Sequence, residues 1–157
     1  MRKRPLPESW PDLDDEALLD LRMSDLPLKI EGTLAARIEQ IREELRSCGL
    51  GFPLHFYLSD EWFTSDGSTA VAVPFYLAHP RLESLERKQM LEVEGGEHEW
   101  CMRILRHEAG HAIDSEYRLR RRRTRRQIFG SPRQPNHEFY TPKPYSRSFG
   151  LHLDAWY

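Results

Sequence analysis

The sequence predicts an α+β fold in which a small twisted sheet lies over one long helix. Residues 54–63 and 69–77 are rich in β-branched and aromatic residues, and the first run alternates apolar and polar side chains. Residues 97–119 instead repeat their apolar side chains at helical spacing, and this segment contains the sequence HEAGH at 107–111. A chain of 157 residues is long enough for one sizeable core.

Composition narrows the class of protein. The chain is 39% hydrophobic and 31% charged, as in a globular domain, and no apolar run reaches transmembrane length. The N-terminus lacks the apolar stretch of a signal peptide, so we expect a cytoplasmic protein. Cys48 and Cys101 are far apart in sequence and are expected to be reduced core thiols, which excludes a cysteine-based zinc site.

The sequence pattern changes near residue 32, from a proline-rich segment to one with helical periodicity, and this change indicates the domain organisation. Residues 1–32 contain four prolines and predict an N-terminal arm that packs loosely on a core formed by residues 33–157. An amphipathic helix is predicted for residues 33–47, with Thr33 as its N-cap and Gly49 just beyond its end.

The β-rich runs and the next helix follow. The sequence SDGS at 65–68 predicts a turn between the two runs. Pro74 lies within the second run and cannot donate to a ladder, which predicts an edge or bulged strand. A charged helix is predicted over 80–94, ended by Gly95 and Gly96.

The HEAGH segment carries the chemistry. His107 and His111 are four residues apart on a helix, so both imidazoles can reach one zinc ion. Glu108 lies about 100° further round the helix, where it can take a proton from a zinc-activated water and pass it to the leaving amine. Small residues at 109 and 110 would let a substrate approach closely, and Asp114 is a candidate partner for the free nitrogen of a ligand histidine.

A catalytic zinc ion needs a third protein ligand, and the sequence leaves its identity open. Candidates downstream are His137, Glu138, His152 and Asp154. The last four residues, DAWY, resemble the DxxY element of aspzincin peptidases, although the match is short. That resemblance would make Asp154 the third ligand and Tyr157 an oxyanion donor.

Two longer segments resemble a bacterial family of zinc-binding metallopeptidases. These are RILRHEAGHAIDSEYRLRRRRTRRQIFG and YTPKPYSRSFGLHLDAWY, and the likeness covers about residues 52–157. The resemblance implies that His107 and His111 bind zinc and that Glu108 is the catalytic base. The family continues into a further helix whose Glu supplies the third ligand, so we expect this chain to be truncated relative to the family.

The resemblance also implies a zincin-like domain. In that fold an edge strand runs along the cleft above the motif helix, and the runs at 54–63 and 69–77 would supply it. The expected activity is zinc-dependent hydrolysis of a peptide bond, with a peptide or protein as substrate. Alternatives are an inactive or fragmentary metal-binding relative, or a binding module of another class.

The binding-module alternative depends on residues 118–126, RLRRRRTRR, which contain seven arginines. Such a run can bind phosphate backbones or an acidic partner. It lacks interleaved aromatic residues and directly continues the motif helix in sequence. We therefore interpret it mainly as a solvated helix end that pairs with the acidic residues of 83–99 or with the C-terminal segment that the family has beyond this chain. We expect neither a nucleic-acid nor a membrane partner.

Overall fold

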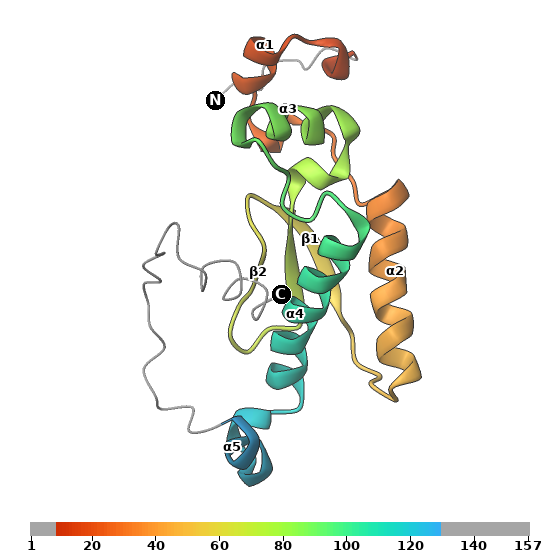
Figure 1. Ribbon diagram of the computed structural model, residues 1–157, viewed down its shortest axis with the longest axis vertical. Coiled ribbons are helices and arrows are strands. Elements are labelled where there is room, and N and C mark those ends of the chain that lie inside the picture. Colours follow the sequence, from red (N-terminus) through yellow and green to blue (C-terminus); the bar gives the residue numbers. More distant parts are fainter. Residues whose placement is uncertain (1–8, 130–157) are drawn as a thin grey trace, which may run out of the picture.

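The computed structural model describes residues 9–129 (Figure 1), and the chain has the predicted mixture of helices and a small sheet. Five α-helices and three strands occur in this range. The helices are α1 (Asp15–Leu19), α2 (Gly32–Ser47), α3 (Pro80–Met90), α4 (His98–Glu116) and α5 (Arg123–Phe129), and the strands are β1 (His55–Ser59), β2 (Phe63–Thr64) and β3 (Ala70–Pro74). Short 3₁₀ helices cover Trp10–Asp12, Met23–Asp25, Phe75–Ala78 and Leu119–Arg121.

The sheet has the order β1-β3-β2. Strand β1 pairs with β3 in parallel, whereas β2 and β3 form an antiparallel hairpin. The predicted single strand over 54–63 is therefore wrong. Residues 60–62 carry the chain past the carboxyl end of β3, so β1 and β2 pair with its opposite edges.

The placement of Pro74 also corrects a prediction, because β3 is the central strand and not an edge strand. Pro74 is the last residue of β3, so the ladder loses little from its missing N–H. Val71, Ala72 and Val73 before it are completely buried. The central strand thus reads as a continuous apolar run, which is typical of a strand covered on both sides.

Helix α4 packs against α2 and also contacts β2 and β3, and in Figure 1 it crosses in front of the sheet. The Thr64 hydroxyl on β2 donates to the backbone carbonyl of Glu108 on α4 at 3.2 Å. Arg106 on α4 donates to both carboxylate oxygens of Glu44 on α2 at 2.8 Å. Strand β2 therefore lies along α4, at an edge of the described sheet.

Helix α2 ends as the sequence predicts but begins differently. The N–H of Gly49 donates to the carbonyl of Arg46, and that of Leu50 to the carbonyl of Leu45, each at 2.9 Å. With Gly49 at φ 73°, these bonds form a Schellman cap. The predicted N-cap Thr33 is inside the helix, because the helix starts at Gly32 after Glu31.

The other two predicted helix ends are wrong. Helix α3 stops at Met90, where Leu91 takes a left-handed conformation with φ 68°, well before Gly95. Helix α4 ends at Glu116, and Arg118 is left-handed with φ 49°. The arginine run therefore does not continue the motif helix.

The segment before α2 packs more firmly than predicted. Trp10 and Leu18 are 7% and 4% exposed and belong to the hydrophobic core. Asp15 accepts hydrogen bonds from Arg81 and Lys88 of α3, both at 2.7 Å. A loosely packed arm is thus the wrong description of residues 9–30.

A buried arginine joins α2 to the turn that precedes α4. Arg37 is 9% exposed, and its Nη1 and Nη2 donate to the backbone carbonyls of Gly95 at 3.1 Å and Gly96 at 2.9 Å. Gly95 has φ 73°, and a Cβ there would lie 3.0 Å from the Trp62 ring, so this turn requires glycine.

The two cysteines are not both core residues. Cys101 on α4 is completely buried, and burial raises the pKa of its thiol. Cys48 is exposed, contrary to the prediction, because it caps the surface end of α2.

We predict that Arg37→Ala lowers the free energy of unfolding by about 2–4 kcal/mol, because one buried and one part-buried carbonyl lose a charged donor. Urea unfolding followed by circular dichroism would measure it. Arg46→Ala, on the exposed face of the same helix, is the control and should shift the midpoint far less. Equal effects of the two substitutions would contradict the role of Arg37.

Candidate metal centre

Helix α4 has one buried face and one exposed face, and the residues of the HEAGH motif are divided between them. The buried residues of the helix are Cys101, Met102, Ile104, Leu105, Glu108, Ala109 and Ala112. His107 is half-buried and His111 is exposed. The motif therefore lies mid-helix, as predicted, and its histidines lie outside the fully buried face.

The two imidazoles converge. Their Nε2 atoms are 3.2 Å apart, and the ring centroids are 4.9 Å apart with the planes 79° from parallel. Two ligands bound at about 2.0–2.1 Å to one tetrahedral zinc ion lie roughly 3.3–3.4 Å from each other. The two nitrogens are within hydrogen-bond distance of each other, and the same spacing also fits shared coordination of one ion.

Glu108, between the two histidines in sequence, is mostly buried. It is 8% exposed, and its Oε2 is buried with no hydrogen-bond partner among residues 9–129. A buried polar oxygen without a partner costs free energy, so such groups are rare unless they serve a function. The backbone carbonyl of Glu108 accepts the Thr64 hydroxyl, which fixes this turn of the helix against β2.

Residues 9–129 contain no group of three histidine, cysteine or carboxylate side chains that could hold a metal. The third-ligand candidates His137, Glu138, His152 and Asp154, and the predicted oxyanion donor Tyr157, all lie outside the described residues. The part of the chain that is described therefore supplies two candidate ligands, His107 and His111, and no third.

Asp114 has a partner that the sequence did not indicate. One of its carboxylate oxygens accepts a hydrogen bond from Nε of Arg120. Nη1 and Nη2 of Arg120 donate to the two carboxylate oxygens of Asp66, at 2.9 and 2.7 Å. Asp114 thus helps to hold Arg120, and its contact with a ligand histidine stays a prediction.

The Arg120 contacts draw the turn between β2 and β3 toward the motif. The N–H of Gly67 in this turn donates to the Ser115 hydroxyl at 3.1 Å. Hydrogen bonding by Arg120 lowers the pKa of Asp66, and the nearby His111 lowers it further. A polar hollow of about 560 Å³ opens here, lined by Gly67, Asp114, Ser115, Glu116, Arg118, Arg120 and Arg121.

The predicted pairing of the arginine run with residues 83–99 is not the one formed by Arg120, whose partners are Asp66 and Asp114. From the sequence, all seven arginines had the same predicted partners. The acidic turn SDGS faces the end of α4 only because β2 and β3 form a hairpin, so no local pattern could have paired Asp66 with Arg120.

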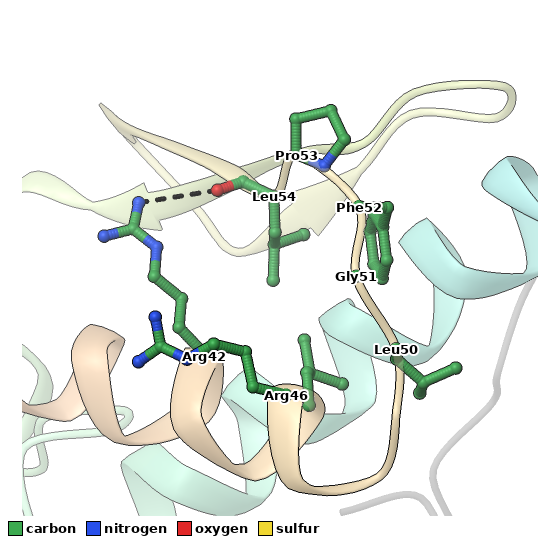
Figure 2. Close-up of a pocket in the computed structure, with 8 residues that line it drawn as sticks. Arg42, Arg46, Leu50, Gly51, Phe52, Pro53 and Leu54 are labelled. Atoms are coloured by element: carbon green, nitrogen blue, oxygen red, sulfur yellow. Dashed lines mark hydrogen bonds between the residues drawn. The ribbon is translucent and has the colours of Figure 1, made fainter.

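A second hollow, of about 460 Å³, lies between the end of α2 and the loop that leads to β1 (Figure 2). Arg42 lines this hollow. Its guanidinium group donates to the carbonyl of Leu54 at 3.4 Å and lies over the Phe56 ring. Its lining residues are Arg42, Leu45, Arg46, Leu50, Gly51, Phe52, Pro53 and Leu54, none of which is on α4. This hollow is therefore separate from the candidate metal centre.

Comparisons with protein-family models, with curated proteins and with solved structures found no match to this chain. The case for the site therefore depends on its geometry. None of the helices within residues 9–129 is long and apolar enough to cross a membrane.

Gly110 gives a test of the open side of the motif. Among residues 9–129, nothing lies within 4 Å of the position that a Cβ would take there. We predict that Gly110→Ala raises the free energy of unfolding by roughly 0.5–1 kcal/mol, since alanine favours a helix interior. Thermal or urea unfolding would measure it, and a loss of stability would contradict the open surroundings.

The Asp66 ion pair predicts a pH dependence of stability. The folded-state pKa of Asp66 lies below its usual value of 3.8, so its stabilising effect is present above that pH and is lost as the pH falls through the folded-state pKa. Asp66→Asn should therefore lower the urea midpoint at pH 7, and the difference from wild type should shrink below about pH 4. A difference that stays constant down to pH 2 would argue against the ion pair.

Proposed function

We propose that this protein is a zinc-dependent peptidase of the zincin type, in which His107 and His111 bind the metal and Glu108 is the general base. One observation carries the proposal. Two imidazole nitrogens converge at 3.2 Å on the same helical turn as a buried carboxylate oxygen that has no partner among residues 9–129.

Each residue has a distinct role in the proposed reaction. Zinc, when bound, would lower the pKa of a water molecule and polarise the substrate carbonyl. Glu108 accepts the proton of the attacking water and later donates it to the leaving amine. The carboxylate is mostly buried, and the hydrogen bond from the Thr64 hydroxyl to the backbone carbonyl of Glu108 holds this turn of the helix in place.

Strand β2 supplies a place for the substrate backbone. In the described sheet the two-residue strand β2 pairs only with β3, so no other strand of that sheet covers its second edge. A peptide added as a strand to that edge would lie beside α4, because β2 itself contacts this helix. In the zincin-type domain that we propose, β2 would serve as the edge strand beside the substrate.

The proposed active form needs one further ligand from outside residues 9–129, with Asp154 and His152 the first residues to test. A chain that binds zinc through two histidines alone would be a weak metal binder without catalysis. The two cases differ in affinity and in activity, so one set of measurements separates them.

We predict that purified wild-type protein binds one zinc ion per chain with sub-micromolar affinity and that His111→Ala abolishes this binding. Glu108→Gln should keep the zinc and lose peptide cleavage by at least a hundredfold, because the carboxylate acts on the proton and not on the metal. Metal analysis, competition with a chelating dye and cleavage of a quenched peptide library would measure these effects.

The matched control is His98→Ala, which removes an exposed histidine from the start of the same helix. It should leave both zinc and activity unchanged. Zinc binding that survives His111→Ala would overturn the metal site. Tight binding without cleavage of any peptide would overturn the peptidase and leave a metal-binding protein.

A further inference from the structure

Arg120 follows a reversal of the chain that is itself costly. Helix α4 ends at Glu116, and Arg118 then takes a left-handed conformation with φ 49°, which a residue with a Cβ rarely adopts. The 3₁₀ helix Leu119–Arg121 completes the reversal and returns Arg120 to the side of α4. Such backbone strain persists only where surrounding contacts hold it.

The contacts of Arg120 use the whole guanidinium group. Both Nη atoms donate to the two oxygens of Asp66, and Nε donates to Asp114. This planar fork is stronger and more directional than a single ion pair. The side chain of Asp114 is only 16% exposed, which limits screening of its half of the network, whereas that of Asp66 is 78% exposed.

These contacts belong to a row of hydrogen bonds that connect the β2–β3 hairpin with α4 and the 3₁₀ helix after it. Thr64 binds the carbonyl of Glu108, Gly67 binds the Ser115 hydroxyl, and Asp66 binds Arg120. The row runs along α4 from the turn of the proposed base to one turn beyond His111. Arg120 therefore closes the far end of the hairpin against the helix beside a metal ligand.

We propose that Arg120 is a positioning residue, which fixes the edge strand β2 relative to His111 and so sets where a peptide paired with β2 places its scissile carbonyl. This inference depends on the proposed function. Arg120 touches neither metal nor substrate and acts through Asp66 and Asp114. Its charge is used inside the protein and is not offered to a nucleic acid or an acidic partner.

The test compares two neighbouring arginines. Arg120→Gln removes the network, whereas Arg121→Gln removes the same charge one residue away, from a side chain without an ion pair in the described part of the chain. The probes are acetohydroxamate, which reports only an open position on zinc, and a peptide hydroxamate, which must also pair with the edge strand. Affinities are measured by calorimetry on zinc-loaded protein.

We expect Arg120→Gln to weaken the peptide hydroxamate roughly tenfold or more while acetohydroxamate stays within about twofold, because a small displacement of the strand disturbs only the extended ligand. Arg121→Gln should change neither affinity. Arg120→Lys should recover part of the loss, since lysine keeps the charge but not the fork. In active protein, the same order should hold for kcat/KM.

The outcomes separate the two proposals. Equal affinity of Arg120→Gln and wild type for the peptide hydroxamate overturns the positioning role alone. Equal weakening of both hydroxamates also overturns it, because a general disturbance of the metal site would then explain the effect. Wild-type protein that binds no acetohydroxamate overturns the proposed function and this inference with it.

Discussion

The arrangement of the whole domain depends on one buried guanidinium group. Arg37 extends from α2 to the carbonyls of Gly95 and Gly96, which would otherwise be buried acceptors at the entrance to α4. Hydrogen bonds to a charged donor are stronger than neutral ones, and a single side chain here satisfies two carbonyls. The bond therefore sets both the position and the direction in which the motif helix begins.

With its start fixed, α4 has little freedom elsewhere. Its buried side packs on β3 and α2, and its middle is held by Thr64 and by the Arg106–Glu44 pair. The positions of His107 and His111 follow from their place on this helix. Burial of Glu108 comes from the same geometry, since residues 108 and 112 fall on the packed side of the helix.

Periodic and local features of the sequence predicted their structures well. The motif helix, the end of α2 at Gly49 and the two β-rich regions are all present, because each depends on spacing or on one residue with a special conformation. The convergence of His107 and His111 followed from helical spacing alone. The third ligand and the oxyanion donor stay predictions.

Features that depend on distant pairing were not predictable in this way. The division of residues 54–63 into β1 and β2 depends on both pairing with β3, and the central position of β3 depends on Pro74 falling at its end. The burial of Trp10 depends on packing against residues far along the chain. Nothing in the sequence distinguishes Arg120 from the other arginines of the run. It pairs with Asp66 because the β2–β3 hairpin brings that residue close to it.

The convergence of the histidines on one helical turn also bears on how metal and folding are related. In zinc fingers the ligands come from separate segments, so the metal must bring the chain together and its removal unfolds the domain. Here both imidazoles project from a single helix, and the buried side chains of that helix, among them Cys101, Leu105 and Ala109, belong to the hydrophobic core. If the proposed site holds zinc, removal of the ion with a chelator should not unfold the domain. The fraction of protein that carries zinc should then depend on the metal concentration around it.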